Sequence, residues 1–117
     1  MTTRIDLEIY QGETFKHTFP ALEDDGGNLI DLTKAGYTAE MELRDHPLDG
    51  DLIISFSDGN ELTLNADGTI DLEVSSITTE EFDFFEVVYD LRFSTPDGDV
   101  RYPYKGHILL DHSVTTS

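Results

Sequence analysis

Short clusters of Asp, Gly and Asn are the parts of this sequence best suited to bind a metal ion, since Ca²⁺ prefers oxygen ligands. Four such clusters occur: Asp24-Asp25-Gly26, Asp49-Gly50-Asp51, Asp58-Gly59-Asn60 and Asp97-Gly98-Asp99. None has the spacing over about twelve residues and the terminal Glu with which an EF-hand surrounds its ion. Asp and Asn also favour turns, because their side chains bind the neighbouring backbone. We therefore expect these clusters to form turns, and we expect no metal ion or other cofactor.

The residue types that serve as nucleophiles, bases and zinc ligands are not arranged in catalytic patterns. The chain has no Cys, and no serine lies within the Gly-x-Ser-x-Gly turn of hydrolases. The four histidines lack the HExxH spacing of a helical zinc site; they are His17, His46, His107 and His112. His17 shares a strand face with two Phe residues, so we expect it to be partly buried and hydrogen-bonded. Paired carboxylates could hydrolyse a glycoside, but among 25 acidic residues some pair reaches the required distance by chance, so we expect no enzyme activity.

Aromatic residues provide the remaining candidate site, a protein interface. Tyr102 and Tyr104 lie close together in a segment, 100–110, that also contains a Pro and a Gly. These two residues favour a bulge or a strand at the edge of a sheet, where Pro need not donate a hydrogen bond. Tyr and Phe concentrate at the buried centres of interfaces, although they also pack inside cores. On the interface interpretation, Tyr102, Tyr104 and His107 bind a partner protein along an exposed edge strand.

The charge of the chain excludes several kinds of partner. It carries 25 Asp and Glu against seven Lys and Arg, a formal net charge of −18. Such a field repels phosphate, so we expect no nucleic-acid partner. The acids are spread along the whole chain and form either a solvated surface or a face that meets a basic partner. No apolar run approaches the ~20 residues that span a bilayer and no signal peptide is evident, so we expect a soluble protein made in a cytoplasm, without a membrane partner.

The size and the residue pattern suit one domain made of strands. A chain of 117 residues can bury enough surface for a single domain over 1–117, and without Cys it does not depend on disulfides. Apolar and polar residues alternate with a period of two, which is typical of half-buried strands. This alternation predicts strands near 4–10, 13–19, 37–44, 52–57, 61–65, 69–75, 85–93 and 100–110. Such spacing, without long helices, predicts an all-β sandwich or barrel.

One short segment has a helical pattern. Thr78 and Glu81 have the Ser/Thr-x-x-Glu spacing of a capping box, in which each side chain binds a backbone N–H at the start of a helix. The segment has room for only a turn or two before the strand expected at 85–93. We expect it to carry the chain from one sheet to the other.

The order of turns and strands resembles that of a known family. The stretches that carry the resemblance are IYQGETF at 9–15, IDLTKAGYTAEMELRD at 30–45, DGTIDL at 67–72, YDL at 89–91, TPDG at 95–98 and GHILL at 106–110. They are similar to small immunoglobulin-like β-sandwich proteins of the tail and structural modules of bacteriophages and prophages, among them the N-terminal domains of upper baseplate proteins. The family usually has a Gly before its YDL-type strand, where this chain has Asp83-Phe84. The resemblance implies an immunoglobulin-like antiparallel β-sandwich of seven to eight strands with one short helical turn.

The resemblance also implies a function without catalysis. Family members are virion components that attach to other virion proteins, so we expect a structural, protein-binding module of the tail, baseplate or host-adsorption apparatus, oligomeric within the particle. The expected location is the virion, assembled in the bacterial host cytoplasm. Two alternatives stay open. One is a capsid decoration protein, in which an acidic domain lies over the junctions of capsid subunits; the other is a carbohydrate- or calcium-binding adhesin domain.

Overall fold

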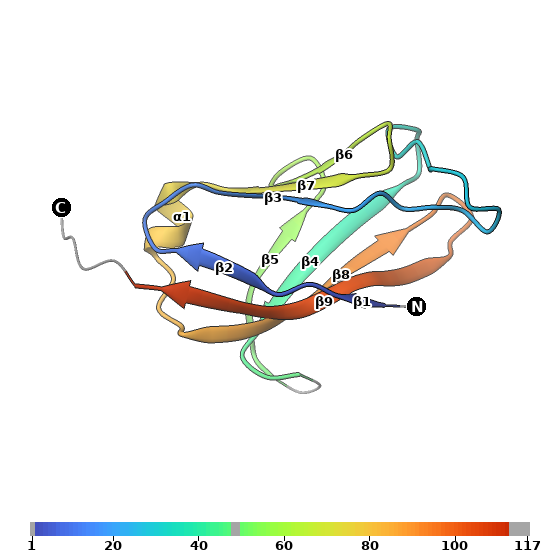
Figure 1. Cartoon of the computed structure of the whole chain (residues 1–117). Helices are drawn as coiled ribbons and strands as arrows, with labels where there is room; N and C mark the ends of the chain where they lie inside the picture. The colour runs from blue at the N-terminus through green and yellow to red at the C-terminus, as the bar shows by residue number, and fades with distance from the viewer. Residues whose placement is uncertain (1, 48–49, 113–117) are drawn as a thin grey trace.

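The strands form two sheets that stack face to face as a β-sandwich (Figure 1). The computed structural model describes residues 2–47 and 50–112. The larger sheet has the order β1-β9-β8-β4-β5, with β2 also paired to β9; its strands are Thr3–Arg4 (β1), Leu7–Tyr10 (β2), Thr38–Arg44 (β4), Leu52–Ser57 (β5), Glu86–Ser94 (β8) and Val100–Asp111 (β9). The smaller sheet has the order β3-β7-β6, from Phe15–Phe19 (β3), Leu62–Leu64 (β6) and Ile70–Val74 (β7). The predicted all-β sandwich is confirmed.

The period-two alternation of the sequence determines which side chains fill the space between the sheets. In β8 every second side chain is buried, and these are Val87, Tyr89, Leu91 and Phe93. The neighbouring strand β4 buries Ala39, Met41 and Leu43 in the same way. The smaller sheet supplies the opposite wall with Phe19, Ile70, Leu72 and Val74. The polar residues between these positions face solvent, so the outer face of each sheet is set by the same pattern that builds the core.

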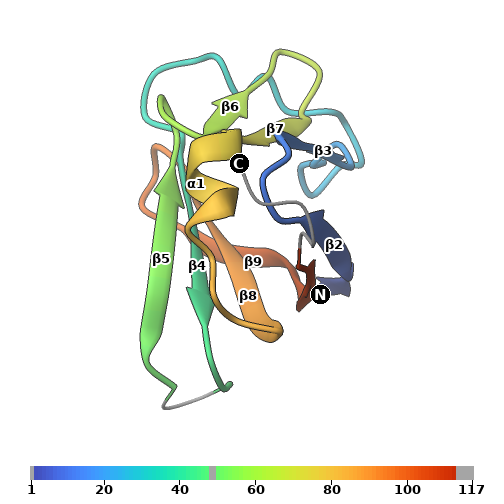
Figure 2. The ribbon, with the colours of Figure 1, turned by 90° about the vertical axis from the view of Figure 1, so that its left-hand side faces the viewer.

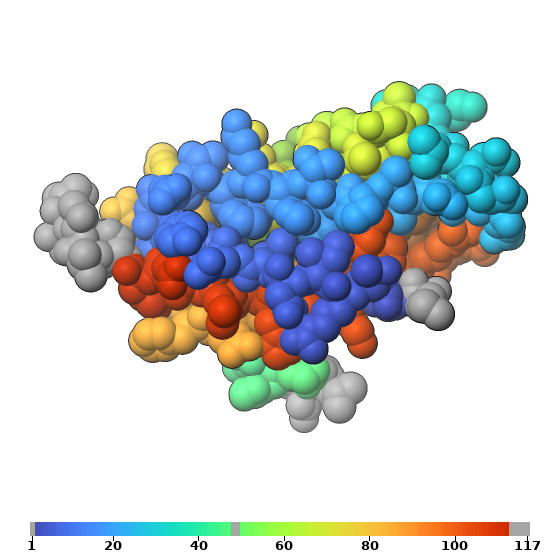
Figure 3. Space-filling model, viewed as in Figure 1, coloured from blue at the N-terminus to red at the C-terminus, as the bar shows by residue number. Residues whose placement is uncertain are grey.

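From residue 104 onward the strand β9 lies inside the larger sheet, so the prediction of an edge strand at 100–110 is wrong there; among the described strands, residues 100–103 pair with β8 alone. It pairs antiparallel with β8 on one side and parallel with β1 and β2 on the other. Pro103 is tolerated because it lies at a bulge, where the pairing shifts from Leu91–Tyr104 to Phe93–Arg101. Figure 3 shows the N-terminal segment, in blue, lying against β9, in red, along one side of the molecule.

A short helix, α1, spans Ser76–Glu80 and connects β7 of the smaller sheet to β8 of the larger one, as predicted. Its N-cap is Ser75, whose side chain accepts a hydrogen bond from the backbone of Thr78. The predicted capping box, with Thr78 as the cap and Glu81 closing it, is therefore wrong by three residues, and Glu81 caps the C-terminus instead. Neither α1 nor any other described segment forms a helix long and apolar enough to cross a membrane.

Candidate protein interface

The strands β4, β8 and β9 turn a set of mainly polar side chains to solvent on the outer side of the larger sheet. The pairing register aligns these side chains in rows: Glu42 lies opposite Asp90, and Asp90 lies opposite Lys105. Arg4 of β1 continues this row beyond Lys105. We define the outer face by three such rows, which are Glu40 and Arg92; Glu42, Asp90, Lys105 and Arg4; and Arg44, Val88 and His107.

The outer face differs in charge from the rest of the chain. The sequence has seven basic and 25 acidic residues. The outer face holds four of the basic and three of the acidic residues, which leaves three basic and 22 acidic residues elsewhere. These three rows are therefore nearly balanced in charge within a strongly acidic protein; the next row on the same side of the sheet, Glu86, Leu109 and Glu8, adds two carboxylates at their border. Arg92 and Lys105 form no ion pair with any residue that the structure describes, so both remain available to carboxylates of a partner.

A shallow hollow of about 450 Å³ lies in the outer face and is lined by three of its four basic residues. Arg44 is fixed there, since its guanidinium donates to the Glu42 carboxylate at 2.9 Å and to the Gly50 carbonyl at 3.0 Å. Partial burial and the Glu42 carboxylate raise the pKa of Asp90, while Arg44 opposes this shift. The hollow thus offers charged groups of both signs on a rigid sheet, an arrangement suited to polar side chains of another protein.

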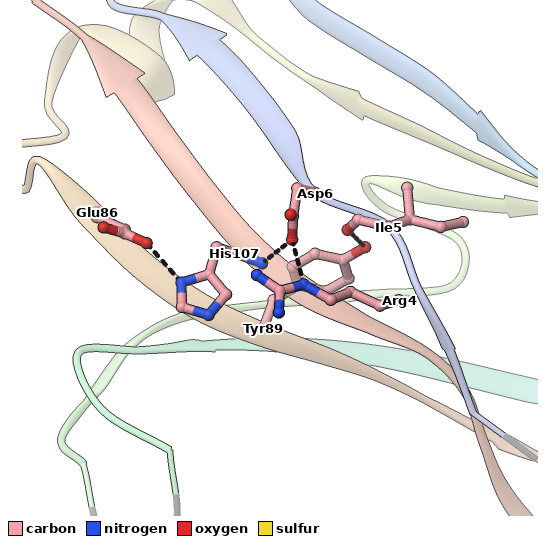
Figure 4. Close-up of polar contacts among 6 residues, drawn as sticks. All are labelled: Arg4, Ile5, Asp6, Glu86, Tyr89 and His107. Atoms are coloured by element: carbon pink, nitrogen blue, oxygen red, sulfur yellow. Dashed lines mark hydrogen bonds and ion pairs between the residues drawn. The ribbon is translucent and has the colours of Figure 1, made fainter.

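A polar cluster at one border of this face attaches the N-terminal segment to β9 (Figure 4). The ladder is interrupted between β1 and β2, where the Asp6 carboxylate accepts hydrogen bonds from the His107 N–H at 2.9 Å and from Arg4 Nε at 3.1 Å. The His107 N–H, followed by Arg4, holds the pKa of Asp6 below its usual value. The buried Tyr89 hydroxyl donates to the Ile5 carbonyl. These groups bind one another and the backbone, so we assign them a structural role.

The structure separates the three residues predicted to form an interface. Tyr104 is only 5% exposed; its ring stacks on Phe19 and its hydroxyl donates to the Pro20 carbonyl, so it is a core residue rather than an interface residue. Tyr102 is 48% exposed and borders a depression in the outer face. His107 lies in the outer face and pairs with Glu86. Tyr102 and His107 therefore stay interface predictions.

The interface prediction missed the charged residues of β4 and β8. Their period-two alternation was visible in the sequence, since Glu40, Glu42 and Arg44 fall on the polar side of 37–44. What the sequence does not contain is the register that brings them beside Arg92 and Lys105, because register depends on pairing between distant strands.

The Asp-rich clusters form turns, as predicted. Asp24 accepts hydrogen bonds from the backbones of Gly26 and Asn28, both at 2.9 Å, and the Asn28 N–H is the main group that lowers the pKa of Asp24. In the cluster at 58–60 the Asn60 N–H closes the turn by donating to the Ser57 carbonyl, while the Asp58 carboxylate accepts from the Ala39 N–H of β4. The cluster at 49–51 lies partly outside the described residues. Within the described ranges no three His, Asp or Glu side chains gather as a metal site would require.

His17 lies in β3, between the sheets. It packs edge-on against Phe19 with ring centroids 4.7 Å apart, and burial lowers its pKa. The predicted partial burial is thus correct. The predicted hydrogen bonding is not, because Nε2 contacts no donor or acceptor among the residues described.

Comparison with models of known protein families gives no match, and comparison with curated proteins gives none either. The resemblance to phage β-sandwich proteins therefore stays a prediction.

Proposed function

We propose that this chain is a non-catalytic, protein-binding module of a bacteriophage virion, in the tail, baseplate or host-adsorption apparatus, where it binds other virion proteins. The observation that carries the binding role is the charge balance of the outer face. Its place in a virion rests on the sequence resemblance alone.

Charge decides where a partner protein can approach this molecule. Outside the outer face a partner meets 22 carboxylates and three basic residues, so any acidic surface is repelled. At the outer face the two signs nearly cancel, and two basic side chains lack partners among the described residues. Complementary charges across an interface fix orientation and partner choice more than they add affinity. This face therefore favours selective protein binding.

The strand order is compatible with the immunoglobulin-like sandwich that the resemblance implies. In such sandwiches, with strands counted in chain order, one sheet contains the second, fifth and fourth strands and the other contains the third, sixth and seventh. We count β1 and β2 together as the first strand and leave β5 out of the count. The sheet β3-β7-β6 then contains the second, fifth and fourth strands, and β4, β8 and β9 are the third, sixth and seventh. The strand β5 is an additional strand at the margin of the larger sheet. Many functions share this architecture, so the strand order supports the fold and not a partner.

The binding role is tested by reversing charge on the outer face. An Arg92→Glu, Lys105→Glu double variant should lose incorporation into particles by about tenfold, since it places two carboxylates among Glu40, Glu42 and Asp90. A Lys16→Glu, Lys34→Glu double variant makes the same change of net charge at exposed positions outside the face and should incorporate normally. Incorporation is measured by quantitative mass spectrometry of purified particles. Equal incorporation of both double variants would contradict the role of the outer face.

The virion role is tested separately by locating the wild-type chain. Cryo-electron microscopy of purified particles should place it at the tail, the baseplate or the adsorption apparatus. Density on the capsid surface would instead identify a decoration protein. If no particle of the host's phages contains the chain, the virion assignment is wrong, whatever the outer face binds.

A further inference from the structure

The strand β5 forms an exposed margin of the larger sheet that lacks the usual protection of edge strands. Figure 2 shows β5 at the border of the sheet, with no labelled strand or helix beyond it. Its sequence, LIISFS, has no charged residue and no Pro, and Leu52 and Ile53 are 48% and 41% exposed. Edge strands are normally guarded by charges, by Pro or by short length. The other margin strands follow this rule, because β1, β2 and β3 carry charges and β6 has three residues.

The pairing register shows that Ser55 directs its backbone away from the sheet. Asp58 N–H donates to the Ala39 carbonyl, so these two residues form a hydrogen-bonded pair of the β4–β5 ladder. Hydrogen-bonded and non-hydrogen-bonded pairs alternate along antiparallel strands. The Glu42–Ser55 pair, three positions further along, is therefore of the non-hydrogen-bonded kind. The N–H and C=O of Ser55 accordingly point to the free margin.

Leu52, on the other side of a bulge, also directs its backbone away from the sheet. The register shifts by one residue between Leu43 and Arg44, and beyond this point Asp45 N–H donates to the Asp51 carbonyl. The adjacent Arg44–Leu52 pair is then non-hydrogen-bonded, which turns the N–H and C=O of Leu52 to the margin, where they have no backbone partner among the residues described. Within the described part of the chain, two residues of one short strand thus present free donors and acceptors beside exposed apolar side chains.

Charge indicates what can add to this margin. Asp51 directly precedes β5 and is exposed, whereas Asp58 directly follows β5 and turns its carboxylate to the Ala39 N–H of β4. An added strand with basic residues at its ends therefore meets opposite charge at Asp51 and in the chain as a whole, which carries −18. A second copy of this chain is disfavoured, because antiparallel pairing of two β5 strands brings these aspartates together in two molecules that each carry −18.

We infer that β5 is a docking edge at which an extended, basic-ended segment of a partner protein adds as a further strand of the larger sheet. Main-chain hydrogen bonds at Ser55 and Leu52 supply the attachment, as in other cases of strand addition, while contacts to Leu52 and Ile53 and to Asp51 select the segment. The inference rests on the proposed function only in taking this domain to bind proteins.

The edge is tested on the purified full chain with a synthetic peptide of alternating Val and Thr and a Lys at each end. Amide hydrogen exchange measured by NMR should be fast at Ser55 and Leu52 in the free protein and slower with the peptide. The amides of Ile54 and Phe56, which face β4, should be protected in both states. A peptide that ends in Glu should bind about tenfold more weakly. Equal binding of the two peptides, or changes confined to another strand, would refute the inference.

A backbone variant provides the second test. Ser55→Pro removes the outward N–H without removing a bond to β4, and Pro is tolerated at such edge positions. It should abolish peptide binding, whereas Ser55→Ala keeps the N–H and should bind as the wild type does. Sedimentation should show that the wild-type chain is a monomer. If the wild type is instead a dimer and Ser55→Pro is a monomer, the strand that adds to β5 comes from a second copy of this chain, and the inference is overturned.

The outcomes distinguish the two proposals. If Ser55→Pro enters particles normally while Arg92→Glu, Lys105→Glu does not, the edge inference falls and the proposed function stands. If Ser55→Pro is excluded from particles while Arg92→Glu, Lys105→Glu enters them normally, the role of the outer face is refuted and the inference about β5 stands.

Discussion

Replacing Gly106 by Ala tests whether the N-terminal segment must lie directly against β9. Gly106 has no left-handed backbone angle, so Ala is disfavoured only by space. A Cβ built there would lie 2.1 Å from the Ile5 carbonyl oxygen and 2.7 Å from the Ile5 carbonyl carbon. Both atoms belong to the backbone, and the segment between β1 and β2 has to move by about 1 Å before the contact becomes tolerable.

The expected loss of stability follows from this displacement. Overpacking of this kind costs about 1–3 kcal/mol. Moving Ile5 also breaks the hydrogen bond from the buried Tyr89 hydroxyl, which contributes about 1 kcal/mol. We therefore expect Gly106→Ala to lower the free energy of unfolding by about 2–4 kcal/mol. Urea denaturation measures it, as a lower midpoint with an unchanged slope.

A matched control separates close approach from a general effect of losing a glycine. A Cβ on Gly26 would meet the Asn28 amide nitrogen at 3.2 Å, on a side chain that can rotate, and the Asp24 carboxylate at 3.4 Å, an ordinary van der Waals distance. Gly26→Ala should therefore change stability by less than about 0.5 kcal/mol. The reasoning is refuted if Gly106→Ala unfolds at the wild-type midpoint, or if both variants lose the same stability. If only the N-terminal segment detaches, amide exchange will accelerate at 3–10 while β8 stays protected.

Three further variants test single groups of the core. Thr79→Val should cost about 2–3 kcal/mol, because the Thr79 hydroxyl donates to the Glu13 carbonyl and accepts from the Gly12 N–H, and both lose their partner; Thr79→Ser should retain most of the stability in the same denaturation assay. Tyr104→Phe should cost about 1 kcal/mol by removing one hydrogen bond, with normal incorporation into particles, since Tyr104 is buried. Burial lowers the pKa of His17 in the folded state, so the unfolded chain takes up the proton first and wild-type stability falls as pH drops below about 6.5. In His17→Phe this fall should be smaller, as measured by the thermal midpoint between about pH 5 and pH 8; an identical pH profile would show that His17 does not contribute.

The strands could be predicted because their signal is local. The alternation in 85–93 and 37–44 identifies both the strands and the side chains that enter the core, and the structure agrees at each buried position of β8. The place of each strand in a sheet is not local. Pro103 and Gly106 favoured an edge strand or a bulge, and which of these forms depends on residues far away in the chain: a bulge against β8 accommodates Pro103, and the backbone of Ile5 approaches Gly106.

The start of α1 could not be predicted from local sequence either. Ser75 and Thr78 each have a pattern that can cap a helix, and local propensity does not choose between them. In the structure the helix takes the earlier start, which places Thr79 near its C-terminal end, buried, where its hydroxyl binds the backbone of the turn between β2 and β3. The capping pattern was visible in the sequence, but this partner lies more than sixty residues away.

The candidate interface could not be predicted for a related reason, and its geometry connects the two proposals. The outer face exists only through the register of β1, β9, β8 and β4, which aligns residues from four separate segments. The same register pairs Glu42 with Ser55, so the middle row of the outer face ends at the exposed edge of β5. A strand that adds to β5 therefore extends those rows beyond Ser55, and the protein that supplies it comes to lie beside Glu42 and Asp90. In a chain whose acidity repels acidic partners elsewhere, the balanced face and the uncharged edge form one continuous surface on which a single partner can make both contacts.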